Sequence, residues 1–264
     1  MKIYFNKYHG AGNDFIIIDN RNGLFPHRDQ RLIEKMCDRH FGVGADGLML
    51  LSEHKGYDFE MRYFNSDGKE STMCGNGGRC MVAFARKLGL VDEKARFLAS
   101  DGLHQAMFRD GLISLSLSDT DPPVTVRGNH FINTGSPHYI VPVPDVSSMD
   151  VAQKGGKLRH SPDFAPGGTN VNFVESNPDG ITVRTFERGV EAETLSCGTG
   201  VTAAAISSRW GKGTGKQKVK VRTPGGNLEV SFVIGGKKIT SVCLTGPAEF
   251  VFEGVWGVNE EDKR

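Results

Sequence analysis

The sequence predicts an α/β protein of the α+β kind, made of two similar domains with many short strands and a few buried helices. Three observations lead to this prediction. Alternating or β-branched runs recur at intervals of roughly ten residues, separated by Gly, Asn and Asp, which is typical of antiparallel or mixed sheets. Two helical segments are apolar on most faces. The layout of the first half of the chain reappears in the second half.

The predicted strands share alternation or β-branched residues and are bounded by turn residues. They cover residues 15–19, 47–51, 59–64, 112–118, 171–175, 181–187, 218–223, 228–234 and 249–254.

Three helices are predicted, over residues 29–40, 77–89 and 200–211. Asp29 is the expected N-cap of the first helix, and a glycine ends each of the other two. Because those two helices are apolar nearly all round, we expect them to be buried inside a sheet or barrel.

The repeat is clearest around two cysteines. Residues 61–89 and 183–211 each contain a strand, a polar loop, a glutamate, then Cys-Gly-x-Gly and a helix. The two cysteines are 123 residues apart (197 − 74), and so are the glutamates that precede each by four residues (193 − 70). We interpret this as an internal duplication. The polar segment 118–124, with two prolines, is the expected boundary, which gives domains of residues 1–119 and 120–252.

Composition excludes several classes of protein. Lys and Arg number 32 and Asp and Glu 31, so a net charge of +1 gives no reason to expect a nucleic-acid or membrane partner. The N-terminal residues lack the features of a signal peptide, and no stretch approaches the ~20 apolar residues that cross a bilayer. We therefore expect a cytoplasmic protein. Five cysteines without a Cys-x-x-C pair indicate neither a disulfide framework nor a metal site.

A cysteine at a helix N-terminus has a distinct chemistry. The partial positive charge there favours the thiolate, and the backbone N–H groups can bind a carboxylate. Two such sites facing each other could hold one carboxylate with a sulfur on each side of its α-carbon. One thiolate would remove the α-proton and the other thiol would return a proton to the opposite face. The sequence has no phosphate-binding loop motif and no lysine in an obvious pyridoxal context, so no cofactor is expected.

The other three cysteines have a simpler interpretation. Cys37 and Cys80 fall inside predicted helices and Cys243 inside an apolar strand-like segment. We expect them to act as small hydrophobic side chains.

Six short motifs together resemble the diaminopimelate epimerase family, in the family's order and over nearly the whole chain. They are HGAGNDF (9–15), FNSDG (64–68), MCGNGGRC (73–80), GSPH (135–138), ERG (187–189) and CGTG (197–200).

The resemblance implies a pyridoxal-independent two-base epimerase that interconverts LL- and meso-diaminopimelate, a step towards lysine and peptidoglycan. It implies two pseudo-symmetric domains, each a mixed β-barrel around a central helix, with the active site in the cleft between them. The C-terminal segment, residues 253–264, would complete the first domain. Members are commonly homodimers.

The resemblance also assigns roles to residues. Cys74 and Cys197 would be the base and acid pair, flanked by His138 and Glu187, which would assist thiol activation. The other matched residues would bind substrate: the backbones of Gly75, Asn76, Gly198 and Thr199 at the reacting carboxylate, Asn13 near the reacting end, and Asn65, Asn170, Glu187 and Arg188 at the distal amino-acid centre.

This sequence departs from the family pattern at two positions. Some members have Gln where this chain has Gly47, and many have Asn where it has Ser136. An amide offers a donor and an acceptor at longer reach than a hydroxyl. Both positions concern substrate recognition rather than the cysteine pair.

Three alternatives remain open on the residues. One is another cofactor-independent cysteine racemase or epimerase, acting on proline or hydroxyproline, which would need no Glu187 and Arg188 for a distal centre. The second is a non-catalytic ligand-binding relative of the same fold. The third is a thiol redox protein in which Cys74 and Cys197 form a disulfide.

Overall fold

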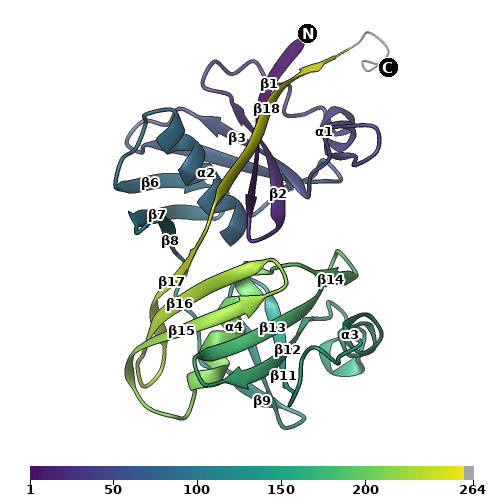
Figure 1. The fold of residues 1–264 in the computed structure, drawn as a ribbon, viewed down its shortest axis with the longest axis vertical. Helices are drawn as coiled ribbons and strands as arrows, with labels where there is room; N and C mark the ends of the chain where they lie inside the picture. The colour runs from purple at the N-terminus through teal and green to yellow at the C-terminus, as the bar shows by residue number, and fades with distance from the viewer. Residues whose placement is uncertain (259–264) are drawn as a thin grey trace. The chain divides into compact units, whose positions relative to one another are not determined.

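The computed structural model describes residues 1–258 and divides the chain into two compact units (Figure 1). Unit 1 contains Met1–Leu115 and the chain from Pro247 onward, and unit 2 is Ser116–Gly246. The first boundary lies four residues before the expected one (119 − 115), and the chain returns to unit 1 six residues earlier than expected (253 − 247). Part of the predicted return segment, residues 259–264, lies outside the described residues.

Unit 1 is a mixed sheet with two helices. Its strands pair in the order β18–β1–β2–β3–β4–β6–β7–β8, and the pairs β2–β3 and β4–β6 are parallel. The elements are β1 (Lys2–Gly10), β2 (Asn13–Asp19), α1 (Gln30–Cys37), β3 (Gly47–Ser52), β4 (Phe59–Asn65), β5 (Glu70–Ser71), α2 (Gly75–Lys87), β6 (Lys94–Ala99), β7 (Gly102–Arg109), β8 (Leu112–Ser116) and β18 (Glu249–Gly257).

Unit 2 repeats this design. Its strands pair in the order β9–β10–β11–β12–β13–β15–β16–β17, and the pairs β11–β12 and β13–β15 are parallel. The elements are β9 (Val124–Val126), β10 (Asn129–Asn133), β11 (Pro137–Pro142), α3 (Val151–Arg159), the 3₁₀ turn η1 (Pro162–Phe164), β12 (Asn170–Asn177), β13 (Gly180–Glu187), β14 (Ala192–Thr194), α4 (Gly198–Arg209), β15 (Gly215–Thr223), β16 (Gly226–Ile234) and β17 (Ile239–Gly246).

The register of the parallel strands repeats as well. Phe15 of β2 pairs with Gly47 of β3, and His138 of β11 pairs with Asn170 of β12. Each residue of the second pair lies 123 positions after its counterpart (138 − 15 and 170 − 47), the same offset that separates Cys74 and Cys197. The predicted α+β fold of two similar halves is therefore confirmed.

Each unit is built around one buried helix. Ten of the 13 residues of α2 are buried, and α2 packs against β1, β2 and β3. In unit 2, α4 contacts β10, β11, β12, β13, β15 and β16, so the sheet curves around it (Figure 1). A glycine with positive φ follows each helix, Gly89 after α2 and Gly211 after α4, as their sequence pattern predicts.

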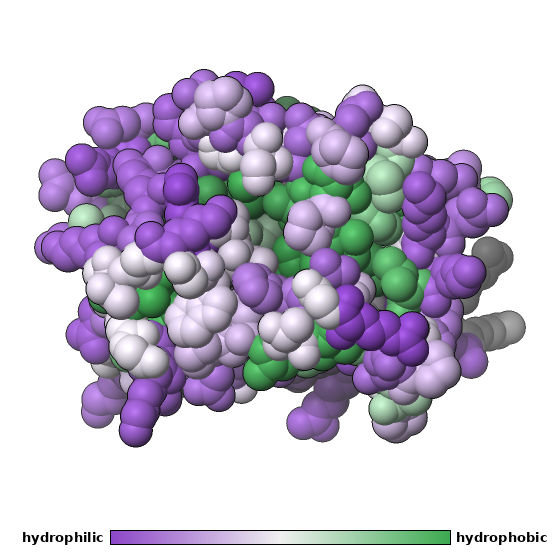
Figure 2. All heavy atoms as spheres, turned by 90° about the horizontal axis from the view of Figure 1, so that it is seen from below, coloured by the Kyte–Doolittle hydropathy of each residue, from purple (hydrophilic) through white to green (hydrophobic). Residues whose placement is uncertain are grey.

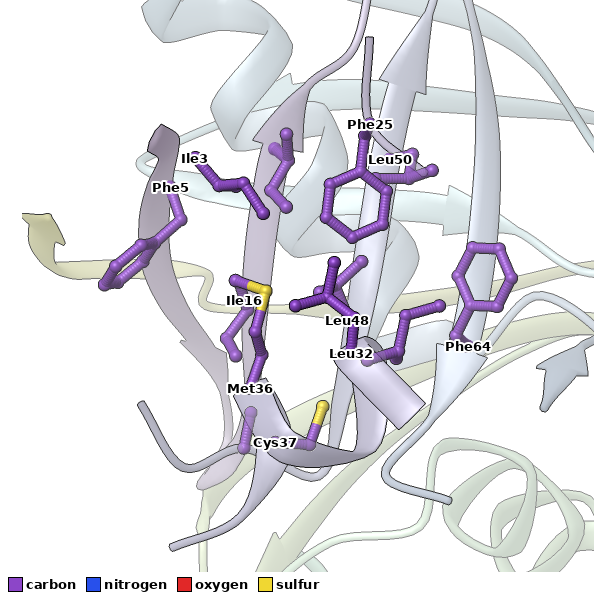
Figure 3. Close-up of a cluster of buried hydrophobic side chains, with 13 residues drawn as sticks. Ile3, Phe5, Ile16, Phe25, Leu32, Met36, Cys37, Leu48, Leu50 and Phe64 are labelled. Atoms are coloured by element: carbon purple, nitrogen blue, oxygen red, sulfur yellow. The ribbon is translucent and has the colours of Figure 1, made fainter. Parts of the chain in front are cut away.

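A second core lies on the other face of the unit 1 sheet, under α1. Asp29 caps this helix, since its side chain accepts a hydrogen bond from the backbone N–H of Leu32. Figure 3 shows Met36 and Cys37 of α1 directed towards apolar side chains of the strands, such as Ile16. Burial raises the pKa of the Cys37 thiol to about 12, which fits its predicted role as a small hydrophobic residue.

Elsewhere the surface mixes polar and apolar groups. Figure 2 shows one face on which apolar residues gather between polar ones. Among the exposed apolar side chains of the described residues are Val124 of β9, which is 57% exposed, and Leu195, which is 52% exposed. Within residues 1–258, no helix has the length and apolar character needed to cross a membrane.

Candidate active site

Cys74 and Cys197 occupy the same position in their units. Cys74 is the N-cap of α2 and Cys197 is the N-cap of α4, both with extended backbone angles. The carbonyl of each cysteine accepts the first hydrogen bond of its helix, from Gly78 and Val201 respectively. The N–H groups of the first turn therefore point out of the helix end beside the sulfur, where they can bind an anion.

In unit 1, Asn13 connects Cys74 to the first turn of α2. Its Oδ1 lies 3.5 Å from the Sγ of Cys74 and 3.4 Å from the Nδ2 of Asn76. Its Nδ2 donates to Asp46, 2.6 Å away, and this contact fixes the direction of the amide. An acceptor oxygen therefore faces the Cys74 sulfur.

A charged cluster supports this arrangement. Arg39 bonds both Asp14 and Asp46, each at 2.7 Å, and the Nζ of Lys7 bonds Asp14 and the backbone carbonyl of Gly44. Burial alone would raise the pKa of Asp14, but the hydrogen bonds from Arg39 and Lys7 outweigh it and lower the pKa to about 2. The Asp14 carboxylate therefore remains ionised at neutral pH.

Arg79 holds the first turn of α2 from inside the unit. Its fully buried guanidinium donates to the carbonyl of Gly75, the Oδ1 of Asn76 and the carbonyl of Pro247. Sequence reasoning missed both Arg79 and Asp46. The signal for Arg79 was available, because a charged residue within a helix that is otherwise apolar needs buried partners.

In unit 2, Thr199 stands between Cys197 and His138. Its Oγ1 lies 3.5 Å from the Sγ of Cys197 and 2.9 Å from the Nε2 of His138. His138 is completely buried, and burial, with a smaller contribution from the charge of Arg188, lowers its pKa to about 3. The imidazole is therefore neutral at physiological pH.

Three of the four residues expected at the distal centre, Asn170, Glu187 and Arg188, lie in unit 2. The Nδ2 of Asn170 donates to the hydroxyl of Ser136, and its Oδ1 accepts the backbone N–H of Arg188, 2.8 Å away. The guanidinium of Arg188 lies 3.5 Å from the same Ser136 hydroxyl. Glu187 accepts a hydrogen bond from Thr194. Ser136 thus bonds two of the predicted substrate residues although it is shorter than the asparagine that many relatives carry.

Asn65, the fourth residue expected at the distal centre, lies at the end of β4 in unit 1. It is exposed and pairs with Gly47 of β3. The two departures from the family pattern, Gly47 and Ser136, therefore each lie beside a predicted substrate residue.

Comparison with known proteins identifies the family. A family model described as diaminopimelate epimerase matches residues 5–126 and residues 130–251. The chain belongs to the diaminopimelate epimerase family. The same model matches two successive segments of equal length, which supports the internal duplication predicted from the cysteine motifs.

Relatives of similar length carry the same name. A diaminopimelate epimerase of Flavobacterium psychrophilum is 49% identical over 256 residues, covering 96% of this chain and 99% of the relative. A diaminopimelate epimerase of Chlorobaculum tepidum is 45% identical over 258 residues, covering 93% and 98%. The predicted family and enzyme class, an isomerase, are confirmed.

Solved structures share the fold of these epimerases. A phenazine biosynthesis protein of the PhzF family from Bacillus anthracis matches with a TM-score of 0.79 at 17% identity, covering 98% of this chain and 100% of that one. A hydroxyproline epimerase from Agrobacterium vitis with bound trans-4-hydroxy-L-proline matches with a TM-score of 0.69 at 15% identity, covering 96% and 92%. At these identities the likeness concerns the fold alone.

Proposed function

We propose that this protein interconverts LL- and meso-2,6-diaminopimelate without a cofactor, using Cys74 and Cys197 as its acid and base. The observation that carries the proposal is the pair of cysteines at equivalent helix N-caps, each beside a first turn of backbone N–H groups. Membership of the diaminopimelate epimerase family and the two relatives that share its name support the substrate.

The chemistry follows from these two sites. A thiolate removes the α-proton of one amino-acid centre, and the electron pair left on carbon delocalises into the carboxylate. N–H groups of Gly75, Asn76, Gly198 and Thr199 would stabilise the charge that develops on the carboxylate oxygens. The other cysteine, as a thiol, delivers its proton to the opposite face of the carbon. The configuration inverts, and the two cysteines have exchanged protonation states.

The other matched residues would select the substrate. We propose that Asn13 binds near the reacting end, while Asn65, Asn170 and Arg188 bind the distal carboxylate and Glu187 the distal ammonium. A planar guanidinium suits a carboxylate, and a neighbouring glutamate suits an ammonium group. The contacts among Ser136, Asn170 and Arg188 support a preformed distal site.

The proposal extends to the setting of the enzyme. We propose that it acts in the cytoplasm in lysine and peptidoglycan-precursor biosynthesis, and as a homodimer. Exposed apolar side chains on one face of β1 and β18 support self-association. Tyr4 and Val255 are cross-strand partners there, 69% and 51% exposed. Sedimentation equilibrium of the protein and of Val255→Asp would test the dimer.

The deciding experiment is proton NMR of LL-diaminopimelate with the purified protein in D₂O, with proline and hydroxyproline in parallel. Loss of the diaminopimelate α-proton signal with appearance of meso product is the expected result. Cys74→Ala and Cys197→Ala should each abolish epimerisation, whereas Cys243→Ala, a matched change in β17, should not. Exchange of proline or hydroxyproline alone would refute the substrate, and an active Cys74→Ala or Cys197→Ala variant would refute the two-base mechanism.

Arg188 provides a second prediction that separates the proposed substrate from the proline alternative. Truncation to Arg188→Ala leaves the distal carboxylate without its charge-assisted hydrogen bonds, each worth about 1.5–3 kcal/mol. We expect kcat/KM for diaminopimelate to fall at least about tenfold. Steady-state kinetics with coupled detection of the meso product measures this, and an unchanged kcat/KM would remove Arg188 from the site.

A further inference from the structure

A chain of buried polar side chains lies beneath the first turn of α4. It runs from Thr185 on β13 through Asn172 on β12 and His138 on β11 to Thr199, and ends at Cys197. Asn172 and His138 are completely buried, and Thr185 is 3% exposed. Neither Asn172 nor Thr185 belongs to the motifs from which the function is proposed.

The backbone fixes the direction of the Asn172 amide. Its Nδ2 lies 3.4 Å from the carbonyl oxygen of Tyr139, which can only accept a hydrogen bond. Its Oδ1 accepts the hydroxyl hydrogen of Thr185, 2.9 Å away. The side that faces the Nδ1 of His138, 3.1 Å away, is therefore the donor Nδ2.

The amide in turn fixes the tautomer of His138. Because Nδ1 faces a donor, it must be the unprotonated nitrogen, and the single ring proton sits on Nε2. Nε2 therefore donates to the hydroxyl oxygen of Thr199, 2.9 Å away.

The last step concerns the Thr199 hydroxyl. Its oxygen accepts from His138, so its own hydrogen is directed elsewhere, and the sulfur of Cys197 lies 3.5 Å away. A hydroxyl that donates to sulfur favours the thiolate over the thiol.

In unit 1 the residues beneath the first turn of α2 are apolar instead of polar. The residues 123 positions before His138 and Asn172 are Phe15 and Met49 (138 − 123 and 172 − 123). A Cβ on Gly77 of α2 would meet Met49 and Phe15, just as a Cβ on Gly200 of α4 would meet Asn172 and His138. The polar chain is thus a feature of one half of the duplicated protein.

We propose that Asn172 and Thr185 are positioning residues which hold His138 as its Nε2–H tautomer, so that the Thr199 hydroxyl donates to Cys197 and stabilises its thiolate. The inference rests on the proposed function, in which Cys197 is one of the two bases. His138 then acts through Thr199 and takes no proton from the substrate. Its lowered pKa agrees with this role, since a neutral ring keeps a single ring proton. The charged groups nearby in this unit are Arg188, whose charge acts on His138, and Glu187 beside it.

The tautomer is tested directly on the unaltered protein. With ring-¹⁵N histidine, NMR distinguishes a protonated from an unprotonated ring nitrogen. We expect the Nδ1 of His138 to stay unprotonated and Nε2 protonated from pH 6 to 9. A proton on Nδ1, or an imidazolium at pH 7, would overturn the proposal. Asn172→Leu should remove the single-tautomer signal, while Thr202→Val, a buried change on the same helix, should leave it intact.

The effect on sulfur is tested by the rate of Cys197 alkylation by iodoacetamide as a function of pH, read by mass spectrometry in a Cys74→Ala background. Thr199→Val should slow alkylation at pH 7 about tenfold or more, because one unit of thiol pKa is a factor of ten in thiolate. Thr199→Ser restores the hydroxyl and should react within about twofold of the parent, as should Thr202→Val. A parental rate in Thr199→Val would contradict the proposal.

Neither measurement contains substrate, so their outcomes are independent of the proposed function. The expected tautomer and alkylation rates with no epimerisation of diaminopimelate would refute the function and leave the polar chain standing. Epimerisation of diaminopimelate by a protein whose His138 is the opposite tautomer would support the function and refute the role of the polar chain.

Discussion

A side chain at position 47 would collide with Tyr63. A Cβ built on Gly47 would lie 2.5 Å from Cε2 of that ring and 2.5 Å from the backbone oxygen of Phe64. The Tyr63 ring, packed edge-on against Phe15, fills the space that a side chain at position 47 would need. The sequence shows the missing amide, but only the structure shows that an aromatic ring replaces it.

Two of the predicted site residues stand out in the sequence itself. Cys74 and Cys197 could be selected because two matched glycine-flanked cysteines are unlike structural cysteines such as Cys80, whose burial raises its pKa to about 12. The supporting residues could not be selected. Asp46 and Asn172 gain their roles from strand pairing between segments some 30 residues apart in the chain, and no local pattern encodes that pairing.

The Asp14 cluster predicts a specific acid sensitivity. Because folding lowers the pKa of Asp14 from 3.8 to about 2, the ionised form contributes stability above pH 4, which is lost as the pH falls from 4 to 2. Arg39 is 55% exposed, so solvent screening limits the contribution to about 1 kcal/mol. Urea unfolding at pH 7 and pH 3 should show a smaller loss for Asp14→Asn than for the wild type. Asp92→Asn, at an 89% exposed side chain, is the control and should match the wild type.

At the scale of elements, local patterns predicted half of the 18 strands and three of the four α-helices in residues 1–258. All nine predicted strands exist, and the three predicted helices are found as α1, α2 and α4. α3 was missed because its sequence VAQKGGKLR places two glycines mid-helix and buries few residues. Asp150 caps this helix, but a single aspartate is too common to predict a helix start. Gly155 is needed because a Cβ there would lie 2.4 Å from Phe186.

The two central helices should respond differently to the same substitution. Gly to Ala within a helix ordinarily gains about 0.5–1 kcal/mol. At Gly77 the new methyl would sit 3.0 Å from the flexible Sδ of Met49, so we expect little net change. At Gly200 it would sit 2.4 Å from the Oδ1 of Asn172, which is held by hydrogen bonds, so we expect a loss of about 1–3 kcal/mol. Chemical denaturation of Gly77→Ala and Gly200→Ala measures both changes in the free energy of unfolding. Equal stabilities of the two variants would contradict the rigidity of Asn172.

At the scale of the whole molecule, the duplication was predicted from a single offset of 123 residues. The offset recurs in the cysteines, in the register of the parallel strands and in the residues under each helix. The sequence could not predict β1, whose alternation is interrupted by Lys7, a charged residue buried against Asp14. The ion pair with Asp14, which forms only in the folded protein, compensates for burying the charge of Lys7 in a strand.

The return of the chain to unit 1 yields a prediction for a truncated protein. β18 pairs with β1 from Lys2 to His9, and Phe250 and Phe252 pack on Tyr8 and Phe5. A chain that ends at Gly246 should therefore keep unit 2 protected from hydrogen exchange and lose protection in unit 1. Adding a peptide of residues 247–258 should restore it. Full protection of unit 1 without the peptide would show that β18 is dispensable.

The same strand has a consequence for how the protein is made. β1 leaves the ribosome before unit 2 and β18 leaves it afterwards, with the 131 residues of unit 2 between the halves of unit 1 (246 − 115). β18 begins 239 residues after β1 ends (249 − 10), so at about 5–20 residues per second β1 waits about 12–48 s for its partner while one edge of the strand stays open to mispairing. Unit 1 thus begins before unit 2 and is completed after it, and chaperones that shield strand edges should affect the yield of unit 1 more than that of unit 2.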